Sequence, residues 1–161
     1  MLFLLAVYGL RCGEVTALRL EDLDWPRHVL RFRRVKTDRV QEYPLTRATA
    51  QAIRHYLQRG RPQSARPELF LTLRAPFRPL SSGAVYAVTE SLFKRLNIVS
   101  RKRGPHSLRH ACATHLINNG FPLKAIGDHL GHTSLTATQI YAKVDLAGLR
   151  AVAAFDLGGL L

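Results

Sequence analysis

Three predicted helices follow one another between residues 104 and 141, and this stretch restricts the fold more than any other. Proline is favoured in the first turn of a helix, and glycine is favoured just after its last turn. Residues of these types, with a Thr-Ser pair that suits a helix start, predict helices over 105–119, over 122–130 and from 133 onward. His106 and Arg109 lie one turn apart on the same face of the first of these helices.

An arginine is predicted between two apolar helices at the start of the chain. Residues 1–8 form an apolar run that Gly9 stops, and residues 14–19 predict the next helix. Arg11, on the short connection, must therefore be partly buried, and a buried cation needs a partner. That partner is either Glu14, in a structural ion pair, or a phosphate group of a ligand.

A β-hairpin is predicted a little further along the chain. The runs 29–35 and 40–44 are rich in strand-forming residues, and a polar turn that begins with Lys36 separates them. Because side chains alternate between the two faces of a strand, Leu30 and Phe32 should face the core.

Helices and loops make up most of the remaining chain. Further helices are predicted over 46–59, 81–96 and 145–155, and a third short strand over 69–73. No linker or internal repeat divides the sequence. We therefore expect one domain, residues 1–161, of the α+β class, mainly α-helical with a small three-stranded antiparallel sheet near the N-terminus.

The charge of the chain points to a polyanionic partner. The 161 residues include 24 lysines and arginines and 11 acidic residues, for a net charge of +13, and 19 of the basic residues are arginine. The planar guanidinium group binds phosphate oxygens two at a time. Nucleic-acid binding is therefore favoured over the alternative of a ribosomal-type or merely soluble basic protein.

The cysteines and the first residues bear on where the chain acts. Cys12 and Cys112 have neither C-x-x-C nor metal-site spacing, and we interpret them as reduced thiols of a cytoplasmic protein. The apolar opening lacks the basic start and the cleavage site of a signal peptide and is too short to cross a bilayer. It is typical of the second half of a buried helix, so we expect the chain to be truncated at its N-terminus.

Four ordered motifs resemble the catalytic domain of the tyrosine recombinase (phage integrase) family. YGLRCGEVTALRLEDLDW is similar to the first arginine motif and VKTDRVQEYPL to the lysine hairpin. HSLRHACATHL is similar to the His-x-x-Arg motif, and DHLGHTSLTATQIY to the last histidine and the nucleophile. Four motifs in order are far more specific than any one alone. The resemblance implies a mainly helical domain with a three-stranded sheet.

The resemblance also implies six catalytic side chains: Arg11, Lys36, His106, Arg109, His132 and Tyr141. Tyr141 would attack a DNA phosphate and hold a 3′-phosphotyrosyl link until a 5′-hydroxyl displaces it. The two arginines and His132 would stabilise charge on the non-bridging oxygens. His106 is the candidate base and Lys36 the candidate general acid. Glu14 matches an acidic position that supports the first arginine. This chemistry requires no cofactor and no metal.

DNA, other copies of the chain and a cytoplasmic, nucleoid-associated location are the expected context. Backbone contacts are expected from five basic residues: Arg31, Arg33, Arg101, Lys102 and Arg103. The family implies a core-binding domain, absent here, and a homotetramer on double-stranded DNA. The C-terminal segment 145–161 would be exchanged between protomers, or would pack on its own domain. No membrane association is expected.

Three other activities remain open. A truncated domain of this fold could bind DNA without recombining it. A type IB topoisomerase uses similar chemistry, although the Leu-Gly-His motif argues against it. A metal-dependent hydrolase would use four histidines: His106, His110, His129 and His132. That activity is disfavoured because no glutamate lies between His106 and His110 as in H-E-x-x-H, and carboxylates are scarce.

Overall fold

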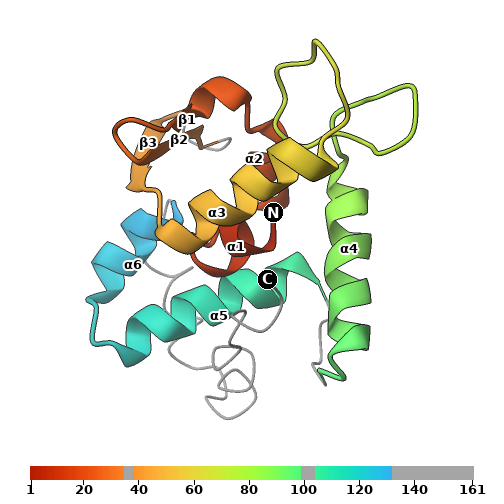
Figure 1. The fold of residues 1–161 in the computed structure, drawn as a ribbon. Helices are drawn as coiled ribbons and strands as arrows, with labels where there is room; N and C mark the ends of the chain where they lie inside the picture. Colours follow the sequence, from red (N-terminus) through yellow and green to blue (C-terminus); the bar gives the residue numbers. More distant parts are fainter. Residues whose placement is uncertain (35–37, 99–103, 132–161) are drawn as a thin grey trace.

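A computed structural model describes residues 1–34, 38–98 and 104–131 of the chain. Helices surround α1 (Leu2–Ala6), and the three-stranded sheet lies at one side of the molecule (Figure 1). α1 packs on α5 (Pro105–Asn118), and α2 (Cys12–Ala17) packs on α4 (Ser82–Arg95). A further helix, α3 (Arg47–His55), is capped by Thr46, whose side chain accepts a hydrogen bond from the backbone N–H of Thr49. The predicted α+β class, with more helix than strand, is confirmed.

The sheet is antiparallel, in the order β1 (Leu23–Asp24), β2 (Val29–Arg33) and β3 (Val40–Pro44). The two longer strands match the predicted hairpin, and Leu30 and Phe32 are buried as expected. The third strand is not the predicted one. Leu71 forms only an isolated bridge with Pro79, because the prolines of this region cannot donate to a strand ladder. The third strand of the sheet is instead formed by residues 23–24, which follow a short 3₁₀ turn, η1 (Leu20–Asp22).

Several helix boundaries differ from the sequence prediction, including the ends of α1 at Ala6 and of α2 at Ala17. α2 begins at Cys12, because Glu14 accepts a hydrogen bond from the backbone N–H of Arg11 and so fixes the first turn at that residue. The predicted helix 46–59 is regular only to His55, and a wider turn, η2 (Tyr56–Gly60), completes it. The short α6 (Leu123–Leu130) ends at Gly131, which has a left-handed backbone conformation with φ +66°.

Two apolar clusters lie among these elements. The fully buried members of the larger cluster come from the first helices, the sheet, α3 and α4, and include Leu4, Leu5, Leu10, Val15, Leu30, Ile53 and Val85. The smaller cluster joins α5 to α6 through Cys112, Ala113, Ile126 and Leu130. Within the described ranges, no helix combines the length and apolarity that crossing a bilayer requires.

Candidate active site

The two candidate arginines, Arg11 and Arg109, meet at the C-terminal end of α6. The last carbonyls of a helix have no partners within the helix and carry a partial negative charge. Here the carbonyls of residues 128–131 all accept hydrogen bonds from side chains of other elements. The donors come from α5, the hairpin and the N-cap of α2, and they are Arg11, Arg34, Gln41, Tyr43 and Arg109.

Arg11 reaches this end from the N-cap position of α2. One terminal nitrogen donates to Glu14 Oε1 at 3.0 Å, and the other donates to the Gly131 carbonyl at 3.0 Å. Glu14 is fully buried, but the Arg11 side chain is 25% exposed. Arg11 therefore has the structural partner that the sequence suggested. Among the described residues, the two bonds of its guanidinium use two of the five N–H donors that such a group carries, so others remain for a phosphate.

Arg109 reaches the same end from α5. It is buried, with 5% exposure, and donates to the carbonyls of Gly9 and Leu130. Gly9 has φ +60°, and a Cβ atom there would lie 2.5 Å from Leu130 Cδ2, so only glycine fits this close approach. Arg11 and Arg109 thus bind consecutive carbonyls, those of Gly131 and Leu130. The structure brings together two arginines that are far apart in the sequence.

A third arginine at this end, Arg34, was not predicted. Its guanidinium pairs with Glu14 Oε2 at 3.0 Å, and the residue is 1% exposed. The signal was present in the sequence, because Arg34 continues the alternation of Leu30 and Phe32 and so belongs to the buried face of the hairpin. Tyr43, which donates to the His129 carbonyl at 2.6 Å, was also missed.

Of the other four predicted catalytic residues, only His106 lies in the part of the chain that the structure describes. His106 lies exposed in the first turn of α5, one turn before Arg109. Lys36, His132 and Tyr141 lie outside the described residues, as do three of the expected DNA contacts, Arg101, Lys102 and Arg103. The last described residue is Gly131, immediately before His132.

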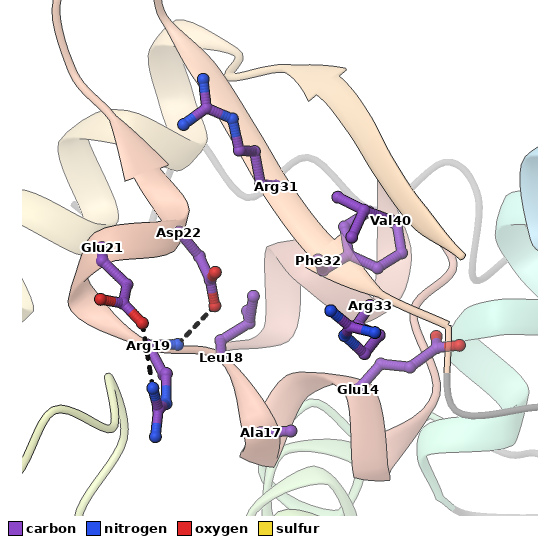
Figure 2. Close-up of a pocket in the computed structure, with 10 residues that line it drawn as sticks. All are labelled: Glu14, Ala17, Leu18, Arg19, Glu21, Asp22, Arg31, Phe32, Arg33 and Val40. Carbon is purple, nitrogen blue, oxygen red and sulfur yellow. Dashed lines mark hydrogen bonds and ion pairs between the residues drawn. The ribbon is translucent and has the colours of Figure 1, made fainter. Parts of the chain in front are cut away.

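The other two expected DNA contacts, Arg31 and Arg33, already have acidic partners. Arg31 binds Asp24 at 3.0 Å and Glu42 at 2.7 Å, and Arg33 binds Asp38 at 3.0 Å. Both line a groove bounded by α2, η1 and the sheet (Figure 2). A DNA phosphate at this groove would therefore compete with carboxylates for the guanidinium groups.

Burial sets the chemistry of the titratable groups around the arginines. It lowers the pKa of His129, and the nearby charges of Arg34 and Arg109 lower it further. Burial also raises the pKa of the Cys112 thiol to about 11 and raises that of Cys12 above its usual range. Both thiols are free, as predicted. These groups favour their uncharged forms at neutral pH.

No alternative metal centre emerges from the residues that the structure covers, since no three His, Cys, Asp or Glu side chains among them are grouped as ligands. His129 instead packs against Tyr43, with ring centroids 4.7 Å apart and the ring planes tilted by 50°.

Comparison with known proteins decides the family. Residues 1–147 match the phage integrase family. The chain belongs to that family. The Sinorhizobium fredii protein y4gC, named as an integrase/recombinase, is 42% identical over 160 residues, which cover 99% of this chain and 82% of y4gC. The tyrosine recombinase XerC of a Mycobacterium species is 36% identical over 146 residues, which cover 89% of this chain and 48% of XerC.

Solved recombinase structures share the fold of this phage-integrase-family chain. The crystal structure of the XerA recombinase superposes with a TM-score of 0.76 at 28% identity, over 94% of this chain and 54% of XerA. A post-cleavage complex of the XerH recombinase gives a TM-score of 0.75 at 22% identity, over 96% of this chain and 44% of XerH. The chain thus spans about half the length of most of these relatives.

Proposed function

We propose that this chain is the catalytic domain of a tyrosine-type site-specific recombinase, which cuts and rejoins DNA strands through a 3′-phosphotyrosyl intermediate. One observation carries the proposal beyond the family. The guanidinium groups of Arg11 and Arg109, from separate helices, bind consecutive carbonyls directly before the segment that contains His132 and Tyr141.

The paired arginines supply the charge stabilisation. During attack on a phosphodiester, negative charge grows on the two non-bridging oxygens, and preorganised donors lower the energy of that state. An arginine remains charged at any working pH and offers several donors in one plane. Arg11 is the more exposed of the two and contacts the phosphate from the solvent side. Glu14 holds its guanidinium in place.

The covalent step forms one bond and breaks one. The phenolic oxygen of Tyr141 bonds to phosphorus as the bond from phosphorus to the 5′-oxygen breaks. His106 accepts the phenolic proton, and Lys36 donates a proton to the leaving 5′-oxygen. His132 donates to a non-bridging oxygen. A 5′-hydroxyl from another strand then attacks the phosphotyrosyl link, which reverses these transfers and conserves the energy of the phosphodiester.

Double-stranded DNA is the proposed substrate, and the similar XerH recombinase has been solved bound to its palindromic difH substrate. A net charge of +13 favours salt-dependent binding to phosphates. We further propose that residues 1–161 are a single catalytic domain that forms the covalent adduct alone and needs a core-binding domain for efficient recombination. The active assembly would be a nucleoid-associated homotetramer on DNA that exchanges segment 145–161.

The proposal is tested by covalent capture from a pool of duplexes. The chain is incubated with nicked DNA of randomised central sequence, in which loss of the short 5′ fragment traps the intermediate. Protein–DNA adducts that resist detergent are recovered and sequenced. The wild-type chain should yield adducts in the presence of EDTA, and Tyr141→Phe should yield none.

Each alternative predicts a different result. Binding of the pool without any adduct would overturn the recombinase proposal and favour a DNA-binding domain without strand transfer. Relaxation of supercoiled plasmid with no preference for sequence would favour a topoisomerase. Cleavage that EDTA abolishes would favour a metal-dependent hydrolase.

A further inference from the structure

Arg34 is a buried arginine that none of the proposed reaction steps uses. It is 1% exposed, so it does not contact DNA directly. Removing a cation from water is costly, and an apolar residue of similar size is often at least as stabilising. A buried arginine at the edge of a catalytic site therefore suggests a role in arranging the site.

The partners of Arg34 come from three separate parts of the fold. Its guanidinium donates to Glu14 Oε2 at 3.0 Å, to Gln41 Oε1 at 2.5 Å and to the carbonyl of His129. It also lies 4.7 Å from the centroid of the Phe32 ring. A lysine at this position could pair with Glu14, but its single ammonium group cannot span all these acceptors.

Arg34 and Arg11 together close a ring of contacts. Arg11 joins Glu14 Oε1 to the Gly131 carbonyl. Arg34 joins the other oxygen of Glu14 to the His129 carbonyl, two residues earlier. The same carboxylate and the same end of α6 are therefore held by two guanidinium groups. Among the described residues, loss of Arg34 leaves Arg11 as the one guanidinium that links Glu14 to the end of α6, so the Arg11 side chain is held less firmly.

The glycine of the Leu-Gly-His motif fits this arrangement closely. A Cβ atom on Gly131 would lie 2.7 Å from Arg34 Nε and 2.9 Å from Arg34 Cδ. Gly131 also has φ +66°, a conformation that other residues adopt only with strain. The Arg34 side chain thus passes directly against the backbone that leads to His132.

We propose that Arg34 is a positioning residue. It fixes Glu14 and the end of α6 relative to each other, so that the Arg11 guanidinium is held where it binds the scissile phosphate. This inference rests on the proposed recombinase function. It predicts that Arg34 acts on the rate of strand cleavage rather than on DNA affinity.

Arg34→Lys is the decisive variant, because it retains the charge opposite Glu14 and so favours folding. Adduct formation is measured in a single turnover, at saturating concentration of a nicked duplex recovered from the wild-type pool. The rate should fall about tenfold to hundredfold, as expected for a small displacement of a reacting group. The Kd for the same duplex, measured by fluorescence anisotropy, should change little.

Arg61→Lys is the matched control. Arg61 also donates to backbone carbonyls, those of Arg66, Glu68 and Leu69, but it belongs to the connection after η2 rather than to the end of α6. Even if Arg61→Lys lowers the Tm as much as Arg34→Lys does, it should cleave at the wild-type rate. The inference would be overturned if Arg34→Lys cleaved at the wild-type rate. It would also be overturned if Arg34→Lys and Arg61→Lys lost the same fraction of the cleavage rate.

A second readout does not depend on cleavage. The ¹H–¹⁵N signal of the Arg11 guanidinium should be sharp and slow to exchange in the wild type, and broadened in Arg34→Lys. If the wild type forms no adduct but this change is seen, the recombinase proposal fails and the positioning of Arg11 stands. An unchanged Arg11 signal overturns the inference whether or not the chain cleaves DNA.

Discussion

The two faces of strand β2 carry arginines in opposite environments. On the inner side, Arg34 directly follows the strand, is fully buried and pairs with the buried Glu14. On the outer side, Arg33 pairs with Asp38, and both of these side chains are mostly exposed. Two arginines at consecutive positions are therefore in opposite environments, one shielded from water and the other exposed to it.

This contrast in burial indicates which ion pair the fold depends on. Between exposed side chains, the attraction is screened by water and opposed by side-chain entropy, so the net gain is typically about 0–1 kcal/mol. When one partner of a buried pair is removed, the other charge remains uncompensated, which costs about 3–5 kcal/mol. The inner face should thus control stability and the geometry of the site, while the outer face should control encounter with DNA.

Glu14→Ala should produce the largest effect. It leaves the guanidinium of Arg34 buried without its carboxylate and removes the partner of Arg11. We expect the free energy of unfolding to fall by about 3–5 kcal/mol. Urea denaturation followed by circular dichroism measures it. A loss as small as that of an exposed pair would remove the distinction between the two faces.

Gly131→Ala should follow, because it disturbs the backbone against which Arg34 packs. The substitution combines a positive φ with a Cβ atom 2.7 Å from Arg34 Nε. We expect the free energy of unfolding to fall by about 1–3 kcal/mol, the usual cost of a residue held in a sparsely populated conformation. The same denaturation experiment gives the value.

Gly13→Ala is the matched control for that substitution. Gly13 lies in α2, and a Cβ atom there would meet nothing within 4 Å. Alanine is favoured over glycine within a helix, so the free energy of unfolding of this variant should rise by about 0.5–1 kcal/mol. Equal losses at the two glycines would show that Arg34 does not restrict position 131.

The residues of the site differ in how far the sequence reveals them. Local rules were sufficient for the hairpin and for the helix end at Gly131, since each depends on neighbours a few positions away. For Arg11 they gave Glu14 as one of two possible partners and left a ligand phosphate as the other. The short strand at Leu23–Asp24 was missed, because two residues give no alternation to detect. The carbonyls that hold Arg11 and Arg109 could not be predicted either, because they depend on how α6 packs against distant elements.

The dependence of stability on pH tests the environment of His129, which lies near Arg34 on the inner side. Because its pKa is lowered in the fold, the unfolded chain binds the proton more readily than the folded protein. This contribution to stability is complete above the unfolded pKa of about 6.5 and is lost as the pH falls from there through the folded value. His129 is only partly buried, so the effect should be moderate.

His129→Gln should therefore flatten the loss of stability between pH 7.5 and pH 5.5, as measured by urea denaturation at each pH. His115→Gln, which replaces an exposed histidine of α5, is the matched control for the loss of an imidazole. A slope that is the same in the wild type and in His129→Gln would show that burial and the charges of Arg34 and Arg109 do not lower the pKa of this imidazole.

Arg33→Gln should have the smallest effect on stability, within about 1 kcal/mol, since its pair with Asp38 is exposed to water. If the outer face meets the DNA backbone, the effect appears in binding instead. The plot of log K against log salt concentration for a mixed-sequence duplex should become shallower by about 0.9, the slope of one phosphate contact. An unchanged slope would show that Asp38 retains Arg33 when DNA binds. The outer face would then contribute only to the general charge of the domain, and the distinction between the two faces would rest on stability alone.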